Sequence, residues 1–140
     1  MSKILSPDIA IITAIGNAHV GILGSREDIA HAKLEVCEGL KNNGKTIIPF
    51  DEATLEPAKN KFTFSIHESL ANAFFMPLRL DSGGTIFDFY SRGKAICGCK
   101  FRIPGEQNFH CLMGAFSCSV LLGIPLRALS DSMEHITPDI

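Results

Sequence analysis

The chain has 140 residues, 46% hydrophobic and 20% charged, with a formal net charge of −2. This length and balance suit one globular domain with a hydrophobic core and leave little room for two. The near-neutral charge gives no support to a nucleic-acid-binding role, which needs a basic patch, and no run of about 18 apolar residues could span a membrane.

The first part of the chain predicts a strand, a helix and a second strand. Ile9–Ile15 is a continuous apolar run with β-branched residues, typical of a strand buried on both faces of a parallel sheet. Ser25 with an acidic residue three places later, Asp28, forms a capping box and predicts a helix of about fifteen residues that ends near Leu40. Because Lys45–Phe50 again has a strand pattern, we expect a βαβ unit closed right-handed over a parallel sheet.

The middle of the chain has a different pattern. Turn signals at 81–84 and 91–94 divide it into short strand-like segments at 61–67, 73–80, 85–90 and 95–103. We expect these segments to form an antiparallel meander, which Pro104-Gly105 ends.

Two helices follow. From Gln107 the apolar residues recur at helical spacing as far as Gly123, with one face formed by Phe109, Leu112, Met113, Phe116 and Val120. Pro125 can open a second helix, with an apolar stripe of Leu126, Leu129, Met133 and Ile136. The expected fold is therefore α/β, with a βαβ unit, an antiparallel meander and two C-terminal helices in a single domain, residues 1–140. Its first strand needs neighbours on both sides, and we expect some of them to belong to sequence outside this chain.

The five cysteines lack the CxxC spacing of zinc sites. Cys97 and Cys99 lie two residues apart in a predicted strand, so we expect them on one face. Buried reduced thiols are favoured over zinc or disulfide roles.

Two residues of the βαβ unit have positions that suit chemistry. At about 100° per residue, Lys33 falls within the apolar stripe of the predicted helix, where a lysine must extend its amine to solvent, pair or be chemically altered. His19 follows the carboxyl end of the first strand, where open α/β sheets place their ligand sites. From the residues alone, Lys33 could reach solvent or act in a site, and His19 could bond within its loop or bind a ligand.

The stretch from Thr13 to Ser25, with Gly16-Asn17-Ala18-His19 at its centre, and the segment Ala32-Lys33-Leu34-Glu35 together resemble the central-domain signature of the Mur ligases. The similarity is strongest to the type that adds D-alanyl-D-alanine to a UDP-muramoyl-tripeptide. In that family the histidine helps hold Mg²⁺, and the lysine is carbamylated by carbon dioxide. The resemblance therefore implies that His19 and Lys33 are catalytic residues and metal ligands, since carbamate oxygens suit a hard cation.

A second segment, Ile103 to Asn108, resembles the family's Pro-Gly-Arg/Lys-His-Asn motif, whose asparagine contacts the adenine of ATP. The resemblance implies that role for Asn108, although an asparagine there could also cap the helix, and both roles are compatible. Glu106 stands in place of the usual basic residue and Gln107 in place of the histidine. Cys111 stands where an asparagine often recurs. These departures suggest a divergent member.

The family's phosphate-binding glycine-rich loop has no convincing counterpart. Gly44-Lys45-Thr46 lacks the earlier glycine and precedes a strand instead of a helix, so we interpret it as a turn. The resemblance then implies part of a central domain, with the N-terminal, UDP-sugar-binding domain before it and the C-terminal domain after it. We expect the chain alone to be inactive and to self-associate through exposed strand edges.

The intact enzyme implied by the resemblance uses ATP and Mg²⁺ to join a UDP-muramoyl-peptide to D-alanyl-D-alanine through an acyl phosphate, in peptidoglycan precursor synthesis. Because the amino terminus lacks the apolar stretch of a signal peptide, we expect a cytoplasmic protein without nucleic-acid or membrane partners. The alternative hypothesis is a stand-alone, non-catalytic binding or interaction module with the same fold.

Overall fold

The structure, a computed structural model, describes residues 2–16 and 24–137. Within them, one six-stranded sheet has the strand order β1-β2-β3-β4-β5-β6. The first four strands pair in parallel and the last three in antiparallel fashion; their bounds are β1 Ile9–Ile11, β2 Lys45–Pro49, β3 Lys61–Ser65, β4 Ala73–Asp81, β5 Gly84–Ser91 and β6 Lys94–Phe101.

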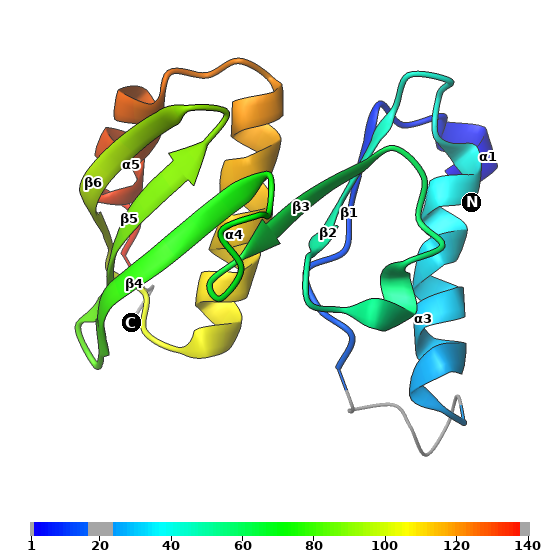
Figure 1. The fold of residues 1–140 in the computed structure, drawn as a ribbon, viewed down its shortest axis with the longest axis horizontal. Helices are drawn as coiled ribbons and strands as arrows, with labels where there is room; N and C mark the ends of the chain where they lie inside the picture. The colour runs from blue at the N-terminus through cyan, green and yellow to red at the C-terminus, as the bar shows by residue number, and fades with distance from the viewer. Residues whose placement is uncertain (1, 17–23, 138–140) are drawn as a thin grey trace.

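Helices pack on both sides of this sheet (Figure 1). On one side α3 (Arg26–Leu34) continues into a 3₁₀ turn, η1 (Glu35–Gly39), and a short α1 (Ser2–Leu5) lies against that turn. On the other side α4 (Glu106–Leu121) contacts β1, β2 and β3, and α5 (Leu126–Met133) contacts β6. A second 3₁₀ turn, η2 (Ala53–Leu55), follows β2 and contacts α3.

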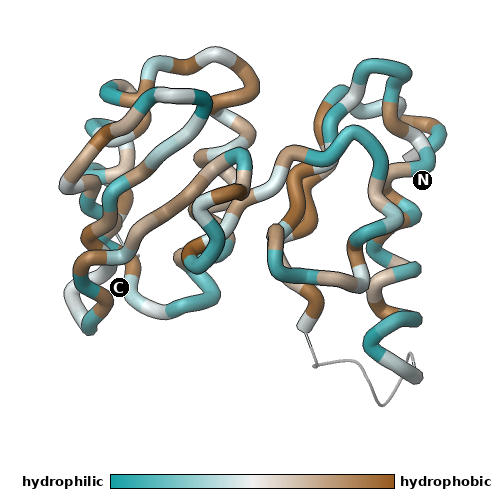
Figure 2. The backbone as a smooth tube through the Cα atoms, in the orientation of Figure 1, coloured by the Kyte–Doolittle hydropathy of each residue, from teal (hydrophilic) through white to brown (hydrophobic). Residues whose placement is uncertain are grey.

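Adjacent residues of β2 belong to two separate hydrophobic cores. Ile47 packs in a phenylalanine-rich core between the sheet and α4, whereas Ile48 packs with Ile29 and Ala30 of α3 on the opposite face. Alternate side chains of a strand point to opposite faces, so a continuous apolar run can be buried on both sides. Figure 2 shows the corresponding hydrophobic colouring along the central strands.

The core between the sheet and α4 is built largely from aromatic rings. The ring centroid of Phe75 lies 4.8–6.2 Å from the ring centroids of Phe87, Phe89, Phe109 and Phe116. These rings come from β4, β5 and α4, so they join the antiparallel strands to the helix. The helical spacing of the apolar residues in α4 therefore predicts its buried face correctly.

Glycine allows α4 to approach the sheet closely. A Cβ added at Gly114 would lie 3.0 Å from Cγ2 of Ile11 and 3.1 Å from Cγ2 of Thr13. A larger residue would push α4 away from β1 and from the segment that follows it.

The predicted α/β fold is confirmed, with local corrections. The first strand is three residues long, although Ile12 N–H still donates to Ile47 O at 2.9 Å beyond its end. The segment 61–67 is not part of the meander: β3 pairs in parallel with both neighbours, and only β4, β5 and β6 are antiparallel. Pairing direction depends on the path of the connecting loop, which a strand pattern does not report.

The prediction that Cys97 and Cys99 share a face is wrong. Cys99 is buried opposite Phe87, and Cys97 is exposed. The pairing register shifts between Ile96 and Cys99, and Gly98, which lies in this interval, has a φ of +70°. A β-bulge adds one residue to one strand and so reverses the alternation of faces. All five cysteines are free, but the expectation of buried thiols is wrong for Cys97 and Cys111, which are exposed; only Cys99 is fully buried.

Two further observations concern the helices. In the part of the chain that the structure describes, no helix is both long enough and apolar enough to cross a bilayer. Ile136, expected in the apolar stripe of the last helix, lies beyond α5 and is exposed, whereas Met133 is buried.

Candidate functional site

The start of α3 is held by the predicted capping box. The backbone N–H of Asp28 donates to Ser25 Oγ at 3.1 Å, and the backbone N–H of Ser25 donates to Asp28 Oδ2 at 2.9 Å. The backbone N–H and hydroxyl of Ser25 lower the pKa of the Asp28 carboxyl. Because both ends of the first turn are tied together, the helix begins at a defined point and so orients the residues two turns later.

An ion pair links that helix to the end of β2. Arg26, the first residue of α3, pairs with Glu52, which also accepts a hydrogen bond from Thr54 Oγ1 at 2.6 Å. Partial burial raises the pKa of Glu52, but the hydrogen bonds from Thr54 and Arg26 and the charge of Arg26 together lower it below its usual value. Glu52 is therefore a carboxylate at neutral pH and connects α3 to the carboxyl edge of the sheet.

Lys33 reaches the chain just beyond β1. Its Nζ donates to the carbonyl oxygen of Ala14 at 2.6 Å, and its side chain is exposed. The expectation that Lys33 lies within the buried stripe is wrong, since Ile29 and Ala30 are buried and Leu34 and Cys37 are partly buried against them. Lys33 is at the margin of this stripe, from which its long side chain follows the protein surface to a backbone acceptor.

A cavity of about 390 Å³ separates Lys33 from the first turns of α4. Its walls come from the segment that follows β1, from α3 and from α4, and consist of Thr13, Ala14, Gly16, Lys33, Glu106, Gln107, His110 and Cys111. His110 Nε2 is 3.9 Å from Glu106 Oε1. The cavity thus combines one lysine amine, one carboxylate and one imidazole.

A second cavity, of about 280 Å³, adjoins the first because both are lined by Thr13, Ala14, Glu106 and His110. It adds Arg26 and the polar residues that follow β2 and β3: Asp51, Glu52, Ser65 and His67. The two cavities together occupy the edge of the sheet where β1, β2 and β3 end. In an open α/β sheet this is the edge that binds ligands.

A buried serine organises the loop after β3. Ser65 Oγ donates to Asp51 Oδ2 at 2.7 Å and accepts the backbone N–H groups of His67 and Glu68, each at 3.0 Å. These contacts join the ends of β2 and β3. No motif in the sequence singled out these residues, although Asp51 and His67 follow strand ends, the position expected of His19.

Known proteins share this fold and part of this sequence. A family model described as the Mur ligase middle domain matches residues 1–119. The chain belongs to the Mur ligase family.

Individual Mur ligases match different parts of the chain. The UDP-N-acetylmuramoyl-tripeptide–D-alanyl-D-alanine ligase of Bacillus subtilis is 50% identical over 58 residues, which cover 41% of this chain and 13% of that protein. The UDP-N-acetylmuramate–L-alanine ligase of Dictyoglomus turgidum is 28% identical over 135 residues, 94% of this chain and 29% of that protein. The crystal structure of MurF from Acinetobacter baumannii aligns with a TM-score of 0.84 at 24% identity, over 99% of this chain and 31% of that one. The chain thus spans less than a third of the length of these Mur ligases.

The structure bears in different ways on the three residues predicted from the Mur ligase signature, Lys33, His19 and Asn108. Lys33 lies at the carboxyl edge of the sheet, as described above. His19 lies outside the described residues, so its predicted meeting with Lys33 stays a prediction. Asn108 is exposed in the first turn of α4, and its Nδ2 donates to Pro104 O at 2.7 Å. The capping alternative is wrong, since Gly105 is the N-cap residue and no side chain caps the helix there.

The metal site expected of a Mur ligase is not complete in the described part of the chain. Across residues 2–16 and 24–137, no three histidine, cysteine or acidic residues lie close enough together to hold an ion. The carboxylates at the carboxyl edge are Asp51, Glu52 and Glu106, of which Glu52 already pairs with Arg26 and Asp51 accepts the Ser65 hydroxyl. The turn predicted at Gly44-Lys45-Thr46 is confirmed: Gly44 N–H donates to Lys41 O at 2.8 Å, and β2 begins at Lys45.

Proposed function

We propose that this chain is part of the central domain of an ATP-dependent, amide-bond-forming ligase of peptidoglycan precursor synthesis. The intact ligase would add D-alanyl-D-alanine to a UDP-muramoyl-peptide through an acyl phosphate. The observation that supports this role best is the position of Lys33, whose amine is held by Ala14 O beside a cavity at the carboxyl edge of the sheet. The 50% identity to a D-alanyl-D-alanine-adding ligase favours that substrate, while the match to an L-alanine-adding ligase keeps the choice a proposal.

Carbamylation of Lys33 would change the charge of this cavity. The ammonium group first loses a proton to solvent. The neutral amine then attacks the carbon of carbon dioxide, a C–N bond forms as one C–O π bond breaks, and a second proton leaves to solvent, so that a cation becomes an anion. The carbamate oxygens would lie near Glu106 and, in the adjoining cavity, Asp51, a donor set that suits a hard divalent cation. Mg²⁺, when bound, would neutralise charge on the phosphoryl oxygens of ATP.

Other residues would position the nucleotide and the reacting groups. Asn108 could offer both a donor and an acceptor to an adenine edge from the first turn of α4. The Arg26–Glu52 ion pair would hold α3, and with it Lys33, at a constant distance from the ends of β1 and β2. Positioning of this kind contributes to catalysis by reducing the motion needed to reach the reactive geometry.

Chemical trapping tests the proposed modification directly. The chain is incubated with ¹³C-bicarbonate, with and without MgATP; carbamates are then alkylated with a trialkyloxonium salt and located by mass spectrometry. We expect the labelled adduct on Lys33, its loss in Lys33→Arg, and its retention in the matched control Lys100→Arg. Absence of an adduct on Lys33 under both conditions would contradict the proposal. In the full-length protein, phosphate release with D-alanyl-D-alanine but not with L-alanine would support the proposed substrate.

Glu106 favours a second candidate, the stand-alone non-catalytic module. Its carboxylate lines the same cavity as Lys33, where it could balance an unmodified ammonium group. For this module we expect no trapped carbamate and no heat of MgATP binding by calorimetry. A glycine-rich loop ending in Gly-Lys-Thr, in frame upstream in the gene, would instead favour the ligase.

A further inference from the structure

The sheet ends at β1, whose outer edge has no strand beside it in the described residues. The carbonyl oxygen of Asp8 and the N–H group of Ile12 each make a hydrogen bond of 2.9 Å to β2. Along a strand, the main-chain groups of successive residues point to alternate sides in the plane of the sheet. The N–H and C=O groups of Ile9 and Ile11 therefore point away from β2, toward the open edge.

An apolar flank of α4 borders this edge on one face of the sheet. Gly114 brings α4 against Ile11, and the buried residues of the helix lie on the side toward β2 and the phenylalanine-rich core. At about 100° per residue, the side beyond β1 carries three apolar residues that are exposed or only partly buried: Ala115, Cys118 and Leu122. An apolar helix flank beside an open strand edge indicates a surface that a further strand and helix would cover.

The sequence of β1, Ile9-Ala10-Ile11, is the same in both directions. Two antiparallel copies related by a twofold axis at Ala10 would place Ile9 of each opposite Ile11 of the other. Opposed residues of this kind exchange two main-chain hydrogen bonds, so every outward-facing group of β1 would be used. A register centred on Ile9 would instead meet Pro7, which has no N–H, and one centred on Ile11 would pair Ile9 with Thr13, beyond the end of β1. The edge is therefore complementary to itself.

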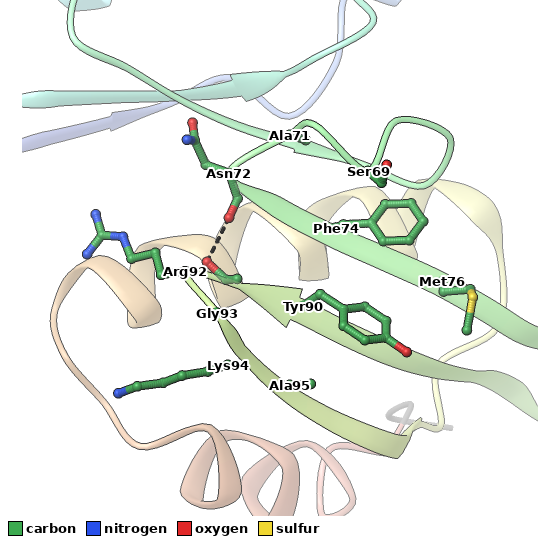
Figure 3. Close-up of a pocket in the computed structure, with 11 residues that line it drawn as sticks. Ser69, Ala71, Asn72, Phe74, Met76, Tyr90, Arg92, Gly93, Lys94 and Ala95 are labelled. Carbon is green, nitrogen blue, oxygen red and sulfur yellow. Dashed lines mark hydrogen bonds between the residues drawn. The ribbon is translucent and has the colours of Figure 1, made fainter.

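The other exposed apolar surface, the outer face of β4, β5 and β6, lacks this complementarity. Figure 3 shows Phe74, Met76 and Tyr90 on this face, where the ring centroids of Phe74 and Tyr90 lie 6.0 Å apart. Farther along β4, however, Arg79 pairs with Asp81 at 2.9 Å. A stable protein interface needs roughly 800 Å² per partner with an apolar centre. Because the apolar part of this face ends within a few residues of the rings, the edge of β1 is the better interface between copies.

We propose that the 140-residue chain forms a symmetric dimer in which the β1 strands of two copies pair in antiparallel orientation. The side chains of Ile9 and Ile11 meet across the seam on the α4 face, and the α4 flanks of the two copies pack beside each other over them. The twofold axis closes the contact, so the assembly stops at two copies. The pairing is independent of the ligase reaction and concerns this chain alone, since in a longer ligase a strand of the same polypeptide could take the edge.

The main-chain contacts can be tested without altering the pairing of β1 with β2. Ile11→Pro removes an N–H that faces the second copy, whereas Ile11→Val keeps this N–H and a β-branched side chain. Because this N–H points away from β2, we expect both variants to keep the circular dichroism spectrum of the wild type. In sedimentation equilibrium, Ile11→Pro should raise the dissociation constant of the dimer about tenfold or more, and Ile11→Val should change it less than about threefold.

A crosslink tests the register. Ile9→Cys and Ile11→Cys, one of them labelled with ¹⁵N, are mixed, oxidised and digested with trypsin. The peptide 4–26, which carries both positions, contains no native cysteine. Opposed residues in a hydrogen-bonded pair have Cα atoms about 5.5 Å apart, within the range of a disulfide. We expect linked peptides of mixed isotopic mass, and few from either variant alone.

Three results would overturn the proposal: a monomer at millimolar concentration, linked peptides from one variant alone in place of the mixture, or association that a folded Ile11→Pro leaves unchanged. The last of these would indicate that the outer face of β4, β5 and β6 joins the copies. If Ile11→Pro does not fold, the crosslink decides.

Discussion

Lys33 Nζ and the carbonyl oxygen of Ala14 lie 2.6 Å apart, although the two residues are 19 positions apart in the chain. The contact joins α3 to the segment that follows β1. It also leaves the amine at the surface of a cavity, where small molecules can reach it.

Replacement of Lys33 should remove the site of carbamate formation and leave the free energy of unfolding nearly unchanged. We expect Lys33→Met to change the free energy of unfolding by less than about 1 kcal/mol, because a hydrogen bond from an exposed side chain contributes little. The measurement is urea denaturation followed by circular dichroism, alongside the trapping experiment. A loss of several kcal/mol would instead indicate that Lys33 has mainly a structural role.

The aromatic core should be sensitive to truncation. Phe75 is fully buried among four other rings, so we expect Phe75→Ala to destabilise the fold by about 3–5 kcal/mol through lost burial and an internal cavity. Leu78→Ala on the same strand is the control. Its side chain is 55% exposed, and we expect a change within about 0.5 kcal/mol. Equal effects in chemical denaturation would contradict the burial of Phe75 and the exposure of Leu78.

The Arg26–Glu52 pair predicts a dependence of stability on pH. The pKa of Glu52 is lowered in the folded state from its ordinary value of 4.5, so its contribution is fully present above that pH. It is lost as the pH falls through the lower, folded-state pKa. Wild type should therefore lose stability between neutral pH and pH 3 more steeply than Glu52→Gln, measured by thermal unfolding. Parallel profiles for the two proteins would rule out this contribution.

Exposed cysteines should react faster with thiol reagents than buried ones. Burial raises the pKa of the Cys99 and Cys118 thiols, which reduces their thiolate fraction, whereas Cys97 and Cys111 are exposed. With a disulfide reagent such as Ellman's, we expect Cys97 and Cys111 to react first and Cys99 only after unfolding. Cys97→Ser should remove one fast phase and Cys99→Ser none. Fast modification of Cys99 in the folded protein would argue against the bulge at Gly98.

The outer edge of β1 should promote self-association. In the described residues β1 pairs only with β2, and Ile11 on it is 40% exposed. An apolar strand edge without a neighbour is a template for pairing with another chain. We expect a mass that rises with concentration in light scattering, and a shift toward monomer in Ile11→Lys but not in Ile4→Lys on α1. A monomer at all concentrations would contradict this expectation.

Patterns that span a few residues predicted the elements well. The capping box at Ser25 and Asp28 and the helical spacing from Phe109 to Phe116 are correct because each depends on neighbours within one or two turns. The resemblance around His19 and Lys33 identified the family from a short segment for the same reason.

Longer-range features could not be read from those patterns. Asp51, Ser65 and His67 meet only because β2 and β3 end at the same edge, and Arg26 finds Glu52 across 26 positions of chain. Gly98 within the strand-like run from Ala95 to Ile103 is a residue that often marks a bulge, but the alternation of the run alone predicts no reversal of its faces.

The amino-acid pattern thus carries the type of each element, the start of α3, the apolar face of α4 and the family. The parallel pairing of β3, the opposite faces of Cys97 and Cys99, the exposed amine of Lys33 and the cavities at the carboxyl edge arise from folding of the whole chain. The first group depends on interactions within a turn or a strand. The second depends on contacts between residues far apart in sequence, whose partners are selected by packing.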